Sequence, residues 1–144
     1  MRLKCFGLIV TLTAYTVGVQ GQATVVVPPE GTSVIRDIAY VPSGHERQVL
    51  DLYVPGSAAR PSPVIVVVHG GAWRTGDKAA NLQVAWGVPI LLNAGYAVAS
   101  VNHRYSQQAK FPAQIHDVKA AVRWLRANAR QHRLDGAGIG AWGM

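Results

Sequence analysis

A run of five consecutive β-branched residues, 64–68, constrains the fold more than any other segment of this chain. Branching at Cβ favours an extended backbone, and an apolar run without polar alternation is typical of a strand buried on both faces of a parallel sheet. The run ends abruptly in His69, Gly70 and Gly71. In α/β proteins, ligand-binding groups lie where such a strand ends. The sequence therefore predicts a central strand whose glycine turn faces a cleft.

The segments on either side alternate between strand and helix patterns. We expect a hairpin of two strands, followed by strand, helix, strand, helix and strand. This order predicts an α/β fold with a mostly parallel sheet and right-handed crossovers. The expected strands are residues 34–40, 48–54, 64–68, 96–101 and 139–142, and the expected helices are residues 79–93 and a segment that begins at Pro112.

Both expected helices have an apolar side. Pro89 lies inside the first one and is expected to kink or split it. The apolar side is formed by Leu82, Ala85, Trp86, Ile90 and Leu91 in the first helix, and by Ile115, Val118, Val122 and Leu125 in the second.

The first 23 residues have the layout of a secretory signal peptide. Two basic residues, Arg2 and Lys4, precede an apolar run, and the small residues Gly21 and Ala23 fit a cleavage site. The run is short for a membrane span, which needs about 20 residues, although an uncleaved anchor is an alternative. Cleavage would remove Cys5, the only cysteine, so we expect no thiol chemistry.

These features predict a signal peptide at residues 1–23 and a single partial domain at residues 24–144. The protein is then secreted or periplasmic, without a stable membrane anchor. The length of 144 residues suits one domain.

The formal net charge of +7 does not indicate nucleic-acid binding, because the basic residues are scattered. A solvated helix face explains the one basic row. No Gly-x-Gly-x-x-Gly or Gly-x4-Gly-Lys-Ser/Thr pattern follows an expected strand, as a nucleotide-binding loop would, and the five histidines lack zinc-ligand spacing, so we expect no cofactor and no metal. The basic row consists of Arg123, Arg126, Arg130 and Arg133.

The string from His69 to Trp73 is the most informative for chemistry. Two glycines after a buried strand allow backbone N–H groups to point into a cleft. Acyl transfer needs such donors, because the substrate's carbonyl oxygen becomes an oxyanion in the transition state, where one fixed donor contributes about 3–4 kcal/mol. A tight turn without chemistry is the alternative. His69 is a candidate general base, but no carboxylate near it in the sequence would orient it, so we favour a role in anchoring the loop.

Several stretches, taken in chain order, resemble the N-terminal part of a serine esterase of the α/β-hydrolase fold. The resemblance is strongest to the secreted carboxylesterases with feruloyl- and acetylxylan-esterase-like (BD-FAE-like) domains, near the hormone-sensitive-lipase type. The matching stretches are residues 50–55, 64–73, 76–78, 96–105, Phe111-Pro112 with Asp117 and 120–125, and Leu134-Asp135 with 139–143.

The resemblance implies roles for the residues after the central strand. The backbone N–H groups of Gly70, Gly71 and Ala72 would form the oxyanion hole, and His69 and Trp73 would shape its loop.

The resemblance also bears on the carboxyl end of the chain. Gly143 and Met144 match the first two positions of the Gly-x-Ser-x-Gly nucleophile elbow. The nucleophilic serine is therefore expected immediately after Met144, and the acid and the histidine still later. We expect the N-terminal half of an α/β-hydrolase fold, truncated before the nucleophile elbow, with no catalytic triad residue and no activity by itself.

The aspartates are expected to be structural. Asp117 is the expected partner of Arg104 or His103, and Tyr105 either lines the substrate cleft or is buried with its hydroxyl paired. Structural roles are also expected for Asp51, Asp77 and Asp135.

The expected function is that of a secreted carboxylic ester hydrolase that acts by Ser-His-Asp acyl transfer in the complete protein. Its substrate would be a small-molecule or carbohydrate-linked ester of the feruloyl or acetylxylan type. The alternative is a non-catalytic hydrolase-like scaffold that binds a sugar or aromatic ester. A Ser-x-Gly sequence directly after Met144 would favour the enzyme.

Overall fold

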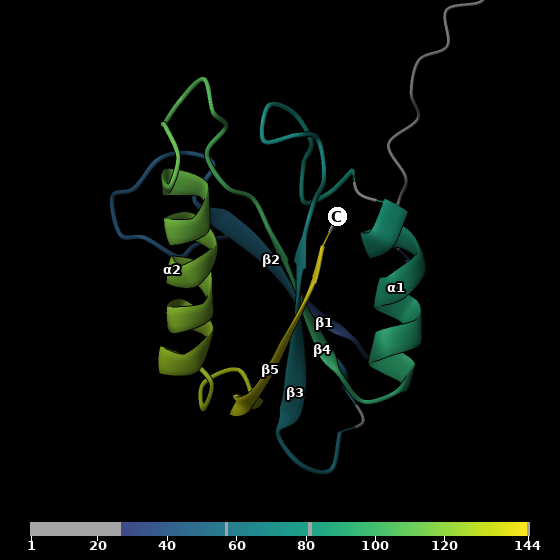
Figure 1. Cartoon of the computed structure of the whole chain (residues 1–144). Coiled ribbons are helices and arrows are strands. Elements are labelled where there is room, and N and C mark those ends of the chain that lie inside the picture. Colours follow the sequence, from purple (N-terminus) through teal and green to yellow (C-terminus); the bar gives the residue numbers. More distant parts are fainter. Residues whose placement is uncertain (1–26, 57, 81, 144) are drawn as a thin grey trace, which may run out of the picture.

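The computed structural model describes residues 27–56, 58–80 and 82–143. The expected signal peptide and Met144 lie outside the described residues. The described chain forms a single sheet with one helix on each face (Figure 1). The strands are β1 (Ser33–Ala39), β2 (Val49–Val54), β3 (Ser62–Val68), β4 (Ala97–Val101) and β5 (Leu134–Gly143), and the helices are α1 (Leu82–Asn93) and α2 (Ala113–Ala127).

The sheet is mixed, with the strand order β1-β2-β4-β3-β5. The hairpin of β1 and β2 is antiparallel, as predicted, and β2 is also antiparallel to β4. Strand β3 runs parallel to both β4 and β5. Only β2 therefore runs in the direction opposite to the other four strands. The prediction of an α/β fold with a mostly parallel sheet is confirmed. The carboxyl ends of β3, β4 and β5 lie at one edge of the sheet, together with the amino end of β2.

The β-branched run forms the centre of the sheet and is buried from both sides. Val64 and Val66 are fully buried in the core cluster on the α2 side, with Leu125. Val67 is buried in a second cluster on the α1 side, with Val84 of that helix. Burying one such side chain contributes about 1.5–3 kcal/mol, so this strand is a rigid base for the loop after it.

The apolar side expected for the first helix is partly wrong, although Leu91 packs against the core as expected. Trp86 and Ile90 are 73% and 69% exposed, whereas Val84, Val88 and Leu92 form the buried stripe. These three residues recur every fourth position, and their compact aliphatic side chains pack closely on the sheet. The helix is also continuous through Pro89 rather than split.

The stripe expected on the second helix is also partly wrong. Its buried residues are Gln114, Asp117, Ala121 and Leu125, and Ile115 is 41% exposed. The buried face includes Asp117, which forms an ion pair with Arg104. The predicted basic row is exposed, as a solvated face should be. Within the described residues, neither helix has the length and apolar character needed to cross a bilayer.

Candidate active site

The glycine loop, defined as residues 70–76, comes after β3 at the edge where the parallel strands end. His69 is the first residue after β3. A cavity of about 530 Å³ is lined by His69, Gly70, Gly71, Ala72 and Trp73. The structure therefore places all five sequence-predicted site residues around one cavity.

The glycine loop contains a left-handed turn. The φ angles of Gly71, Ala72 and Trp73 are 117°, 51° and 58°, a region that residues with a side chain rarely adopt. The N–H groups of Arg74 and Thr75 both donate to the Gly71 carbonyl, over 2.9 and 3.1 Å. Strained backbone of this kind costs about 1–3 kcal/mol per non-glycine residue and is concentrated at functional sites.

The backbone N–H groups of the turn are available for a ligand. Within the described residues, those of Gly70, Gly71 and Ala72 donate to no protein acceptor. Gly71 and Ala72 are exposed, so these donors are open to water or to a ligand. An acceptor such as a carbonyl oxygen or an oxyanion could pair with these groups at the cavity.

The His69 side chain anchors the start of the glycine loop. The side chain is 5% exposed. Its Nδ1 lies 2.8 Å from the Gly70 carbonyl oxygen, and its ring stacks on that of His103, with the ring centroids 4.7 Å apart. Burial lowers the pKa of His69, and the charge of Arg47 lowers it further. A neutral, buried imidazole bound to the loop backbone agrees with the predicted anchor.

The far end of the loop is tied to the end of β4. Asn102 donates from Nδ2 to the Asp77 carboxylate over 2.8 Å and accepts the Lys78 N–H at 2.7 Å. The buried Lys78 Nζ lies 2.7 Å from Asp37 and 2.8 Å from Asp51. These contacts give Asp51 and Asp77 the structural roles that the sequence predicted.

Asp117 is a structural residue and pairs with Arg104, the first of the two expected partners. Its carboxylate accepts hydrogen bonds from the Arg104 backbone N–H, from Arg104 Nε and Nη2, and from Gln48 Nε2. Burial alone raises the pKa of this carboxyl, but the hydrogen bonds from Arg104 and Gln48 outweigh burial and lower it.

The sequence of this chain matches that of a known protein family. The sequence model of the BD-FAE family matches residues 50–144, which is more than half of the chain. The chain belongs to the BD-FAE family. This family lies among the carboxylesterases of the α/β-hydrolase fold, so the resemblance drawn from the sequence is confirmed.

Solved structures similar to this BD-FAE chain include a carbohydrate esterase. A truncated carbohydrate esterase from gut microbiota is 38% identical with a TM-score of 0.72, over 81% of this chain and 41% of that one. A bifunctional GH43-CE protein of Bacteroides eggerthii is 46% identical with a TM-score of 0.69, over 77% of this chain and 16% of that one.

Among curated proteins, the esterase LipQ of Mycobacterium tuberculosis is 34% identical over 104 residues. These residues are 69% of this BD-FAE chain and 23% of LipQ. The chain thus spans about a quarter of the length of that relative.

Residues from separate loops add to the site. Phe111, 70% exposed, lies beside Trp73, 54% exposed, with 6.5 Å between the ring centroids. Tyr105 is half-buried with its hydroxyl paired, since it donates to the Gly76 carbonyl. Arg47 lies over the Tyr105 ring, 3.8 Å from its centroid. No sequence pattern pointed to Arg47 or to the contact between the two aromatic rings, because only the fold brings these residues together.

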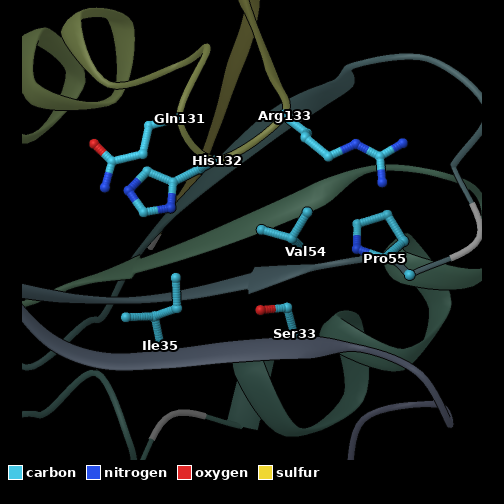
Figure 2. A pocket seen from close by; sticks show the side chains of 8 residues that line it. Ser33, Ile35, Val54, Pro55, Gln131, His132 and Arg133 are labelled. Atoms are coloured by element: carbon cyan, nitrogen blue, oxygen red, sulfur yellow. The ribbon is translucent and has the colours of Figure 1, made fainter.

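A second cavity lies at the opposite end of the BD-FAE sheet (Figure 2). It measures about 280 Å³ and includes Ile35, Val54 and His132, but no residue of the glycine loop. Among the residues that the structure describes, no three His, Cys, Asp or Glu side chains converge as they would around a metal ion. The chemistry of the glycine loop is therefore the strongest functional feature of the described chain.

Acidification is expected to destabilise the protein through His69. Unfolded histidine titrates near pH 6.5, and the folded-state pKa of His69 is lowered. The unfolded state therefore takes up its proton first as the pH falls, so the free energy of unfolding decreases from about pH 6.5 down to the folded-state pKa. Urea unfolding of wild type and His69→Gln at about pH 7.5 and about pH 5.5 measures this. Equal pH dependence in the two proteins would contradict it.

Proposed function

We propose that this chain forms the oxyanion-binding half of a carboxylic ester hydrolase that acts through a serine nucleophile. The N–H groups of Gly70, Gly71 and Ala72 carry the proposal, because they lie at the start of a left-handed turn beside a cavity and donate to no acceptor among the described residues. When a nucleophile attacks an ester, negative charge develops on the carbonyl oxygen. Each N–H group fixed toward that oxygen lowers the barrier by about 3–4 kcal/mol.

The path of β5 supports a nucleophile at this site. Gly143, at the end of β5, pairs with Val68, which directly precedes His69. The carboxyl end of β5 therefore lies beside the start of the glycine loop (Figure 1). A serine after Met144 would stand within reach of the same cavity. In this proposal the serine hydroxyl attacks the ester carbonyl carbon and gives its proton to a histidine base. The histidine returns the proton to the leaving alcohol, and water then hydrolyses the acyl-enzyme.

We also propose that the ester carries an aromatic or sugar group. Trp73 and Phe111 expose their rings beside the cavity, and exposed aromatic rings offer flat apolar surface for such groups. One similar structure is that of a carbohydrate esterase. Feruloyl and acetylxylan esters carry such groups. Residues 1–23 would act as a signal peptide, so that the secreted enzyme meets these esters outside the cell.

The nucleotide sequence after codon 144 and the esterase activity of the full-length product test the proposal. The nucleotide sequence after codon 144 is expected to continue with a serine, any residue and a glycine. The full-length product should hydrolyse p-nitrophenyl acetate with kcat of about 1–1,000 s⁻¹, and substitution of that serine by alanine should abolish turnover. Methyl ferulate and acetylated xylan then test the substrate class. A stop codon at this point, or turnover by residues 24–144 alone, would overturn the proposed mechanism, and the stop codon would favour the ester-binding scaffold.

A further inference from the structure

Arg47 lies beside the glycine loop because β2 is antiparallel to β4. Arg47 lies two residues before β2. Because β2 is antiparallel to β4, its amino end lies beside the carboxyl end of β4, where the Asn102 N–H donates to the Val49 carbonyl over 3.0 Å. Strand β4 is parallel to β3, so His69 lies at the same edge.

The Arg47 guanidinium is held on several sides. Its side chain is 12% exposed. Nε donates to the His103 carbonyl over 2.9 Å, and Nη2 donates to the Gly76 carbonyl over 3.1 Å. The Tyr105 ring lies on one face of the guanidinium, and the Asp77 carboxylate lies 3.6 Å from Nη1. The planar fork is thereby fixed in one orientation, which a lysine ammonium could not reproduce.

The same guanidinium selects one tautomer of His69. Arg47 Nη2 lies 3.2 Å from His69 Nε2. A guanidinium has donors only, so Nε2 must accept, and the ring proton must lie on Nδ1. Nδ1 in turn lies 2.8 Å from the Gly70 carbonyl oxygen, which only accepts. Both hydrogen bonds can form together only when His69 is neutral with its proton on Nδ1.

This tautomer fixes the direction of a proposed oxyanion donor. The Gly70 carbonyl and the Gly71 N–H belong to one planar peptide group, and in a trans peptide they point in opposite directions. Binding of the Gly70 carbonyl to His69 therefore turns the Gly71 N–H away from His69. A protonated His69 would place an N–H donor against Arg47, with His103 stacked on the ring and Asp77 as the nearby countercharge.

We propose that Arg47 is a positioning residue, which holds His69 in the Nδ1-protonated tautomer and thereby fixes the Gly70–Gly71 peptide of the oxyanion loop. The catalytic consequence rests on the proposed ester hydrolysis, but the tautomer does not. Arg47 touches no reacting atom. Its loss leaves the peptide free to rotate, and misplacement of a catalytic group by about 1 Å can cost about 100-fold in rate.

Nitrogen NMR of the full-length protein with ¹⁵N-labelled histidine tests the tautomer directly. Wild-type His69 is expected to show the neutral form with the proton on Nδ1 at about pH 7.5. In Arg47→Met the signal should move toward a mixture of tautomers, and in Arg47→Lys it should lie between the two. The kcat for p-nitrophenyl acetate should fall about 10- to 100-fold in Arg47→Met, with KM changed by less than about threefold. Arg47→Lys should recover part of the rate.

Arg36→Met is the matched control. Arg36 is another arginine of the amino-terminal hairpin, within β1, and it pairs with the buried Asp51 at 2.9 Å, outside the glycine loop. Its loss should lower stability but leave the His69 signal and kcat unchanged. A wild-type His69 with its proton on Nε2, or an unchanged signal and kcat in Arg47→Met, overturns the proposal. If the protein hydrolyses no ester, the NMR result still decides the role of Arg47 separately from the proposed function.

Discussion

Gly71→Ala is expected to lower kcat for p-nitrophenyl acetate about 100- to 1,000-fold in the full-length protein, in proportion to the loss of one oxyanion donor. Gly71 has a φ of 117°, and a Cβ there would lie 2.3 Å from the Thr75 carbonyl oxygen. Backbone oxygen cannot move aside as a flexible side chain can, so the turn must open. The N–H groups of Gly71 and Ala72 would then leave their positions, while KM should change much less than kcat.

Gly95→Ala is the control for the backbone strain alone. Gly95 also has a positive φ, 84°, but a Cβ there meets nothing within 4 Å. It lies before the amino end of β4, at the opposite edge of the sheet from the glycine loop. Gly95→Ala should lose about 1–2 kcal/mol of stability from the left-handed conformation, and Gly71→Ala should lose more because its Cβ also meets the Thr75 backbone, but only Gly71→Ala should lose kcat. If Gly71→Ala keeps kcat within about threefold of wild type, the loop is not the oxyanion site.

The local sequence determined the central strand and the loop after it. Residues 64–68 carry enough β-branched surface to define a buried strand, and the glycines directly after them favour a turn because they adopt left-handed backbone without penalty. The structure accordingly places the run at the centre of the sheet and Gly71 in a left-handed conformation. Both features depend on neighbouring residues in the chain, so a single sequence was sufficient to predict them.

The helix faces and the support of the glycine loop depend on distant contacts. Trp86 and Ile90 were expected in the core by their hydrophobicity, but Val84 and Val88 fit the sheet surface better and are buried instead. Arg47 carries no motif, and its contact with His69 spans 22 residues. Such pairs arise only when antiparallel and parallel strands bring their ends together at one edge, which the local pattern does not encode.

The ion pair of Asp117 with Arg104 provides the largest expected stability effect. Asp117 is 1% exposed, and it accepts two side-chain hydrogen bonds from Arg104, at 2.9 and 2.7 Å. Asp117→Asn removes the charge and leaves part of the guanidinium unpaired. Breaking one partner of a fully buried ion pair typically costs about 3–5 kcal/mol. Because the Arg104 side chain is 28% exposed, water partly solvates its unpaired charge, and we expect a smaller loss of about 2–3 kcal/mol in the free energy of unfolding, measured by urea denaturation at neutral pH.

The pH dependence separates this effect from a general loss of packing. The folded-state pKa of Asp117 is lowered, so its contribution is present above the unfolded value of about 3.9 and is lost as the pH falls through the folded value. Asp117→Asn should therefore be less sensitive than wild type to acid below about pH 4. Asp135→Asn is the control, since Asp135 is exposed and, among the described residues, accepts only the Ala137 N–H, at 3.0 Å. A change of about 0.5 kcal/mol or less is expected there. Equal losses in the two variants would show that the Arg104 ion pair does not hold α2 against the sheet.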